Sequence, residues 1–127
     1  MPYGGVAWQA MHHLSGLRQL GFDVWYVEDS LAPLFHPETQ WTTMECENNV
    51  RFLECWMGRI GLDDRWIFRA PTDGRLLGAD ETTLRRLYEQ ADAVLNLCGA
   101  QEIRPEHDEI DPLCLSPACY LHCAPPG

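Results

Sequence analysis

The sequence predicts an α/β fold, a three-layer Rossmann-like parallel sheet with flanking helices. Helical periodicity alternates along the chain with short apolar runs that are rich in β-branched and aromatic residues. Glycines separate several of these segments. Right-handed crossovers would make the three expected strands parallel. The 127 residues are enough for one domain with a sizeable core.

The first helix is expected over residues 6–20, where apolar side chains recur at helical spacing. Gly4 and Gly5 precede it, and Gly21 follows it in the position of a left-handed stop. Residues 22–27 then form a short run that is apolar enough for a strand buried on both faces. Helix, glycine and buried strand in this order are typical of an α/β sheet.

The middle of the chain predicts a loop, a helix and a strand. Residues 31–42 contain two prolines and are expected to form the loop. A second helix is expected over residues 43–60, with Thr42 or Thr43 as its N-cap. Residues 65–69 predict a short strand.

A third helix and a third strand follow. Residues 71–78 read as a turn-rich connection, after which Asp80 can cap the helix. Residues 93–98 predict another buried strand, ended by Gly99. A doubly wound domain normally opens with a strand that leads into the first helix. That strand is missing here, and its absence would leave a gap in the middle of the sheet.

We assign residues 1–110 to the incomplete domain and residues 111–127 to an irregular tail rich in proline and cysteine. The tail holds three of the six cysteines and shows no periodicity. Cys114, Cys119 and Cys123 lack the C-x-x-C spacing of zinc ribbons, so no metal site is expected. Since no secretion signal opens the chain, we expect the cysteines to be free thiols.

Charge and hydropathy exclude several classes of function. The net charge is −10, which argues against nucleic-acid binding. All nine basic residues are arginine, so Schiff-base and Walker-type lysine chemistry is excluded. No apolar run approaches ~20 residues, so we expect no membrane span and a cytoplasmic protein.

The candidate site lies where helix N-termini and strand C-termini share one edge, because ligands bind there in parallel α/β sheets. Backbone amides at the start of a helix can hold anions or sugar hydroxyls, and glycine exposes them. A tight turn is the structural alternative for the glycine pair. The residues expected at this edge are Gly4, Gly5, Trp8, Glu28, Asp29, Asn96 and Gly99.

Three of these side chains allow more than one interpretation of their role. Trp8 projects away from the apolar stripe of its helix, so it can stack on a sugar or base, or cover the core from the side. Glu28 or Asp29 could bind a hydroxyl or act as a base. Acidic residues after a strand are also common as caps, and that reading is slightly favoured.

The segment from Gly4 to Trp8, together with residues 14–29, resembles the start of GT-B glycosyltransferases. Residues 91–99, followed by Arg104, are similar to a segment of bacterial glycosyltransferase-like proteins of that group. The resemblance covers residues 3 to 107. It departs from the family pattern at two positions, and the C-terminal Rossmann half of these enzymes has no counterpart here.

The resemblance implies transfer of a sugar from a nucleotide-sugar donor to a hydroxyl acceptor, with no nicotinamide and commonly no metal. Glu28 or Asp29 would orient or deprotonate the acceptor, while Gly4, Gly5 and Trp8 would bind substrate or phosphate. Alone, this fragment is expected to be inactive, because one wall of a cleft cannot position two substrates. The alternatives are a non-catalytic nucleotide- or sugar-binding module and a dinucleotide-binding domain with Glu28 on the ribose.

Overall fold

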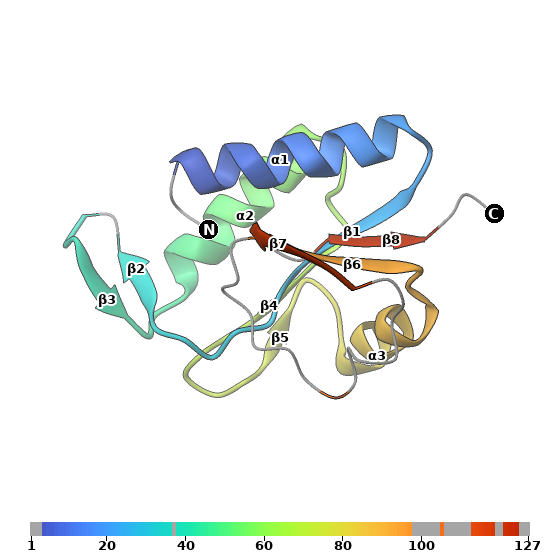
Figure 1. Ribbon diagram of the computed structural model, residues 1–127. Helices are drawn as coiled ribbons and strands as arrows, with labels where there is room; N and C mark the ends of the chain where they lie inside the picture. The colour runs from blue at the N-terminus through green and yellow to red at the C-terminus, as the bar shows by residue number, and fades with distance from the viewer. Residues whose placement is uncertain (1–3, 37, 98–104, 106–112, 119–120, 125–127) are drawn as a thin grey trace.

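The computed structural model describes residues 4–36, 38–97, 105, 113–118 and 121–124. These residues form three helices, a six-stranded sheet and a separate two-stranded hairpin (Figure 1). The helices are α1 (Gly4–Gln19), α2 (Glu47–Arg59) and α3 (Glu81–Gln90). The strands are β1 (Asp23–Glu28), β2 (Leu34–His36), β3 (Trp41–Thr43), β4 (Trp66–Arg69), β5 (Leu76–Leu77), β6 (Ala93–Leu97), β7 (Leu113–Ala118) and β8 (Leu121–Ala124).

The strands of the large sheet follow the order β5-β4-β1-β8-β6-β7. β1 pairs with β4 in parallel, and both β1 and β6 pair with β8 in antiparallel orientation. The three strands expected from the sequence, β1, β4 and β6, therefore run in the same direction, as predicted. The sheet as a whole is mixed and not parallel, because β5 and β8 run the opposite way.

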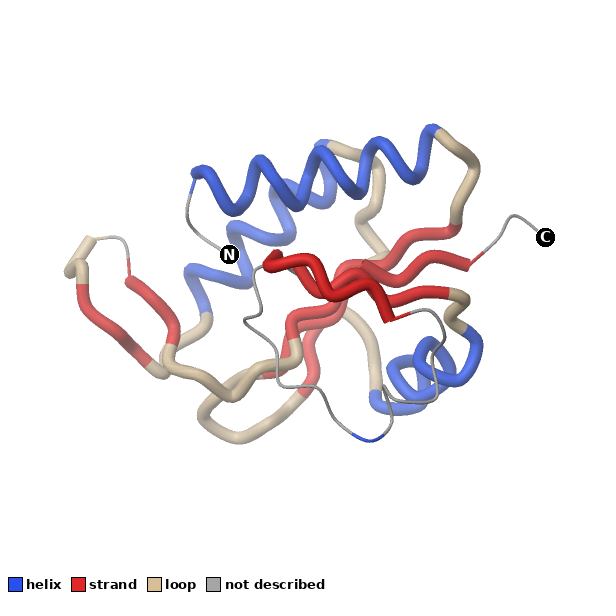
Figure 2. Tube along the Cα trace, viewed as in Figure 1, coloured by secondary structure: helices blue, strands red, loops and turns tan. Residues whose placement is uncertain are grey.

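Helices cover both faces of the sheet, which runs through the centre of the molecule (Figure 2). The strand residues alternate between the two faces, as the pleat requires. The core on the side of α1 and α2 includes Ala10, Leu14, Val24, Tyr26, Leu53, Met57, Trp66 and Phe68. The core on the side of α3 includes Trp25, Val27, Ile67 and Leu84. Both faces of β1 and β4 are buried, which explains why these strands are apolar throughout.

α1 begins earlier than the sequence predicts. It starts at Gly4, so Gly5 belongs to the first turn of the helix and not to a turn before it. The N–H groups of a first turn have no hydrogen-bond partner within the helix, so a glycine at this position destabilises the helix little. The helix ends as expected: Gly21 has a φ of 93°, and its N–H donates to the carbonyl of Arg18 at 3.0 Å.

The loop expected over residues 31–42 contains a hairpin that the sequence analysis missed. β2 and β3 pair antiparallel, with Leu34 opposite Thr43. Gln40 takes the left-handed conformation in the connection, at a φ of 57°. Strands of only three residues leave no readable alternation, so the pattern alone could not reveal them. The hairpin projects beside the start of α2 (Figure 1).

The N-cap of α2 was predicted at Thr42 or Thr43, and this is wrong. The N-cap is Cys46, whose side chain makes no capping hydrogen bond. Thr43 ends β3, and its Oγ1 accepts instead from the N–H of Glu45 at 3.1 Å. A local hydroxyl turn thus replaces the capping interaction that threonine would give.

The connection over residues 71–78 turns back on β4, and β5 pairs with β4 in antiparallel orientation. The predicted cap of the third helix is confirmed. The carboxylate of Asp80 accepts a hydrogen bond from the N–H of Thr83 at 2.8 Å.

The prediction of an irregular segment over residues 111–127 is wrong for the part that the structure describes. β7 pairs with β6, and β8 lies between β1 and β6. A strand flanked on both edges has every backbone group satisfied by neighbours, so it needs no side-chain alternation to form. β7 contains Pro117 and lies at the edge of the sheet, the position that proline tolerates.

Candidate functional site

The carboxyl ends of β1 and β4 lie on the same side of the molecule as the starts of α1 and α2 (Figure 1). A tight turn between Gln19 and Asp23 reverses the chain, so α1 runs opposite to β1. This places Gly5 and Glu28 toward one end of the fold. The edge at which parallel α/β sheets bind ligands is therefore built here from described residues.

Glu28 and Asp29 were predicted as a pair, but they point to opposite faces of the sheet. Glu28 follows Tyr26 on the face covered by α1 and α2, and its Oε2 accepts a hydrogen bond from the Tyr26 hydroxyl at 2.9 Å. Asp29 follows Val27 on the face covered by α3. Adjacent strand residues alternate in this way, so one ligand cannot use both carboxylates on the same face.

Asp29 is engaged in a buried ion pair. Its side chain is only 2% exposed, and its Oδ1 accepts from the Nε of Arg69, the last residue of β4. Arg69 also donates to the carbonyl of Gly74 at 2.9 Å and lies 3.4 Å from a carboxylate oxygen of Glu81. The hydroxyl of Tyr88 lies 3.5 Å from the other Asp29 oxygen. These contacts join the ends of β1 and β4 to α3.

The environment of Arg69 favours its charged form. Burial alone lowers the pKa of this guanidinium, but the hydrogen bonds and negative charges of Asp29 and Glu81 outweigh it and raise the pKa above its ordinary value. Arg69 is therefore a permanent cation that neutralises Asp29. This arrangement stabilises the fold at the strand ends.

The two glycines and Trp8 start the helix on the Glu28 side of the sheet. No described atom lies within 4 Å of the position that a Cβ on Gly5 would take, and Gly5 does not have a positive φ. The tight-turn explanation for this glycine is therefore wrong. Trp8 is 54% exposed, and its ring makes an edge contact with Trp56 of α2 at a centroid distance of 5.4 Å. It partly covers the contact between the helices and remains accessible.

The remaining two predicted residues lie on β6 and just beyond it. Asn96 is buried, and its Oδ1 has no hydrogen-bond partner among the described residues. It follows Val94 by two positions, so it lies on the α3 face with Asp29. Gly99 lies outside the described residues. The predicted set is thus divided between the two faces of the sheet.

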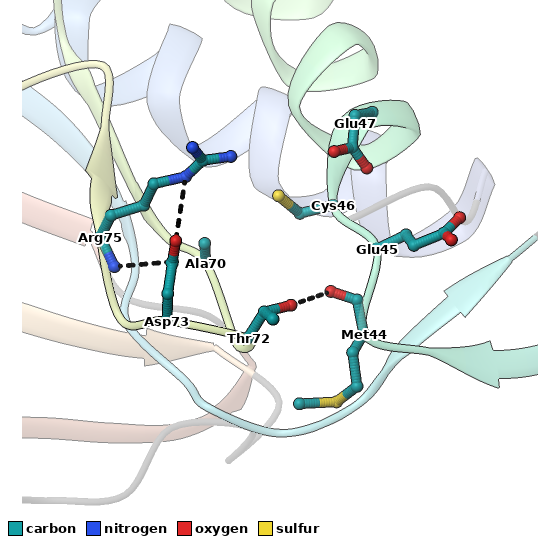
Figure 3. A pocket seen from close by; sticks show the side chains of 8 residues that line it. All are labelled: Met44, Glu45, Cys46, Glu47, Ala70, Thr72, Asp73 and Arg75. Atoms are coloured by element: carbon teal, nitrogen blue, oxygen red, sulfur yellow. Dashed lines mark hydrogen bonds and ion pairs between the residues drawn. The ribbon is translucent and has the colours of Figure 1, made fainter.

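The structure adds a pocket that the sequence analysis missed. It has a volume of about 270 Å³ and lies between the entry to α2 and the loop after β4 (Figure 3). The residues that line it are Met44, Glu45, Cys46, Glu47, Ala70, Thr72, Asp73 and Arg75. No sequence motif marked these positions, because they come from two segments that only the fold brings together.

The pocket lies on the face of the sheet to which Glu28 points. Glu28 is in register with Phe68 of β4, and Ala70, two residues further along, lines the pocket on the same face. The Thr72 hydroxyl donates to the carbonyl of Met44 at 2.8 Å and so joins the two walls. Glu28 and the pocket thus lie on one face of the sheet, whereas Trp8 contacts Trp56, nine residues along α2 from the pocket residue Glu47.

The pocket is acidic. Its charged side chains are three carboxylates and one guanidinium, and that guanidinium, Arg75, lies 3.6 Å from the carboxylate of Asp73 (Figure 3). With its cation paired, the pocket offers mainly hydrogen-bond acceptors. Such a surface suits hydroxyl groups, which donate to carboxylates, and repels phosphate.

A second hollow, with a volume of about 310 Å³, lies at the other end of α1. It is lined by Ser15, Arg18, Gln19 and Ile60. The Arg18 guanidinium donates to the Ile60 carbonyl there, so the only charged group of the hollow ties α1 to the end of α2. No predicted site residue lines this hollow.

Comparisons of the chain with family models, with curated proteins and with solved structures found no match. Among the described residues, no group of three or more His, Cys, Asp or Glu side chains is placed to hold a metal ion. The tail cysteines that were weighed as zinc ligands lie outside the side chains that the structure describes. None of the described helices has the length and apolar character to cross a bilayer.

Proposed function

We propose that this chain is the acceptor-side half of a glycosyltransferase of GT-B type, and that its edge beside Glu28 binds a hydroxyl-bearing acceptor. The order of the parallel strands carries the proposal. A Rossmann half has the order 3-2-1-4, with its first strand in the middle. Here β4, β1 and β6 take the places of strands 3, 2 and 4, and β8 occupies the place of the first.

In this proposal, the carboxylate of Glu28 accepts the proton of the acceptor hydroxyl. It lies at the carboxyl end of β1, on the same face as α1 and the pocket. The acceptor hydroxyl would form its new bond to the anomeric carbon of the sugar while its proton passes to the Glu28 carboxylate. The bond from that carbon to the nucleoside diphosphate would break, and the diphosphate would keep the electron pair. Asp29 takes a structural role, because Arg69 occupies it.

The acidic pocket supports an acceptor site over a donor site. A nucleotide sugar carries two phosphates, and the pocket presents three carboxylates with one paired guanidinium. A neutral sugar acceptor meets hydrogen-bond acceptors there, the groups to which its hydroxyls donate. The donor would be held by a second half, and the fragment alone would bind acceptor without turning it over.

Titration followed by backbone amide chemical shifts tests the proposal. Maltose, as a neutral sugar probe, should shift the amides of Gly5, Glu28 and Thr72, and UDP-glucose should shift them less. Glu28→Gln should weaken maltose binding by about tenfold, because it removes a charged acceptor. Asp64→Asn is the matched control, since Asp64 lies before β4, at the opposite end of that strand, and is exposed.

The alternatives give different results in the same titration. Shifts with NADH and none with either sugar probe would favour a dinucleotide-binding domain. Shifts with UDP alone at the start of α1, unaffected by Glu28→Gln, would favour a nucleotide-binding module. The absence of any shift at the Glu28 edge with every probe would contradict the acceptor site.

A further inference from the structure

A cluster of aromatic side chains lies where α1 and α2 meet. Trp8 of α1 is 54% exposed, and its ring packs edge-on against that of Trp56 of α2 at a centroid distance of 5.4 Å. The ring centroid of His12 lies 5.5 Å from that of Trp8, and the centroid of Phe52 lies 6.0 Å from that of Trp56. The guanidinium carbon of Arg59 lies 5.1 Å from the centre of the Trp56 ring. We call these five residues the aromatic surface.

The aromatic surface continues along the line between the two helices. Ser15 follows Trp8 by about two turns of α1, and Ile60 follows Trp56 by about one turn of α2, so each pair shares one side of its helix. Ser15 and Ile60 both line the hollow of about 310 Å³ at the other end of α1. An elongated ligand can therefore extend from the aromatic surface to this hollow, over about 10 Å along α1.

The two helices bring a cation and no carboxylate to the aromatic surface, although the net charge of the chain is −10. α1 contains no Asp or Glu. The carboxylates of α2, Glu47 and Glu54, are placed about 160–180° around that helix from Trp56 by the helical repeat, so they point away. Arg59 is exposed, and among the residues that the structure describes no carboxylate pairs with it. A positive charge is thus left without a counter-ion.

The groups of the aromatic surface define the chemistry of a ligand that fits it. The indole N–H groups and the guanidinium donate hydrogen bonds and accept none. The indole faces offer apolar area of the kind that protein interfaces use, since Trp and Arg are enriched among the residues that dominate binding energy. A complementary ligand presents an apolar side chain to the rings of Trp8 and Trp56 and a carboxylate to Arg59.

We propose that the aromatic surface docks a short acidic segment of a partner protein. Its apolar side chain packs on Trp8 and Trp56, and its carboxylate pairs with Arg59. A short segment interacts mainly with charges within a Debye length of about 8 Å, where the cation dominates. An anionic bilayer or a second copy of the chain also meets the net charge of −10, which repels it. The proposal does not depend on the proposed function, because none of these residues lines the acidic pocket.

Titration of the full chain with synthetic peptides tests the chemistry of the partner. The probe is a peptide of about ten residues composed of Glu, Leu and Phe, and two control peptides carry Gln or Lys in place of every Glu. The Glu peptide should shift the indole N–H signals of Trp8 and Trp56, leave that of Trp41 in place, and bind about tenfold more tightly than the Gln peptide. Equal binding of the Glu and Lys peptides would overturn the proposal, as would the absence of any shift with about 1 mM Glu peptide.

Matched variants test the location of the site. Trp8→Ala should weaken binding of the Glu peptide about tenfold, whereas Trp41→Ala, which removes a 77% exposed tryptophan from the hairpin, should change it less than about twofold. Arg59→Gln should weaken binding about fivefold, and Arg85→Gln, at an exposed position of α3, should leave it unchanged. Equal losses for the two tryptophan variants, or for the two arginine variants, would show that the peptide binds elsewhere.

Two further measurements address the other occupants of such a surface. Vesicles of phosphatidylserine and phosphatidylcholine should not bind the chain, and the chain should sediment as a monomer. Vesicle binding that Trp8→Ala abolishes would assign the surface to a bilayer. A dimer that Trp8→Ala dissociates would assign it to a second copy. Either result would overturn the assignment to an acidic partner.

Discussion

The guanidinium of Arg69 donates to the carboxylate of Asp29 beneath the edge of the sheet, and this buried pair joins the ends of two neighbouring parallel strands. The side chain of Asp29 is 2% exposed and that of Arg69 is 15% exposed. Each residue directly follows or ends an apolar strand, so the sequence places a charge where the strands leave the core. The pair lets both charges remain there.

Removing one partner of this pair should destabilise the protein strongly. Arg69→Met leaves the Asp29 carboxylate buried without a counter-ion, so we expect the free energy of unfolding to fall by about 3–5 kcal/mol in urea denaturation. The matched control is the exposed pair of Arg65 and Asp23, whose nearest atoms are 2.9 Å apart. Asp23→Asn should cost less than about 1 kcal/mol. Similar losses for the two variants would contradict the role given to burial.

The cap of α3 should make stability depend on pH. Hydrogen bonds from Thr83 lower the pKa of the Asp80 carboxyl below its model-compound value of 3.8. A carboxyl with a lowered pKa in the folded state stabilises that state above its unfolded pKa, and the stabilisation is lost as the pH falls through the folded pKa. Asp80→Ala should therefore be less stable than the parent at pH 7, and the difference should shrink below pH 3.8.

The control for this prediction is Asp80→Asn. Its amide oxygen still accepts from Thr83, but it does not titrate. Urea denaturation of the three proteins at neutral and acidic pH should show that the Asn and Ala variants differ by a constant amount. A difference between them that changes with pH would show that another group titrates.

Two glycines of α1 separate helix stability from ligand binding. A Cβ on Gly5 or on Gly16 meets no described atom within 4 Å. Gly16→Ala should raise the free energy of unfolding by up to about 1 kcal/mol, because alanine favours the helix interior, and Gly5→Ala in the first turn should raise it less. Only Gly5→Ala, or the bulkier Gly5→Val, should weaken maltose binding. Equal binding by Gly5→Val and the parent would remove Gly5 from the site.

Gly78→Ala should destabilise the protein for two reasons, and Gly74→Ala for only one of them. Both have positive φ angles, 87° and 73°, which cost an alanine about 1 kcal/mol. At Gly78 a Cβ would also lie 2.4 Å from the carbonyl oxygen of Trp66, whereas at Gly74 it meets nothing within 4 Å. Gly78→Ala should therefore lower the melting temperature clearly more than Gly74→Ala. Equal melting temperatures would show that the backbone at Trp66 can yield.

The start of a helix was predicted correctly where the local sequence signal agreed with the fold, and incorrectly where it did not. Asp80 directly precedes α3 and its carboxylate accepts from the N–H of Thr83, so the local signal and the fold agree there. Thr43 is also a favourable N-cap residue, but it belongs to strand β3 of the hairpin. Cys46 is therefore the N-cap of α2, without a capping hydrogen bond. The hairpin was not predicted because its two short strands are close together in the sequence. β8 was not predicted because its partner β1 is far away in the sequence. Neither case leaves a periodic pattern.

The candidate site could be predicted in part. The sequence indicated the edge of the sheet, because strand ends and helix starts can be read from apolar runs and glycines. It also indicated Glu28 and Asp29 as one unit, whereas the pleat sends them to opposite faces. Extending the strand by one residue to Glu28 would have revealed this alternation. The pocket between Met44 and Ala70 depends on packing between segments and left no local signal.

The central position of β8 has a consequence for biosynthesis. A ribosome releases the chain in order, so α1, β1, α2 and β4 emerge and can pack while the middle of the sheet still lacks a strand. The backbone edges of β1 and β6 remain open until residue 124 has left the exit tunnel. The unpaired edge of β1, and later that of β6, is therefore open to pairing with other chains until β8 is released.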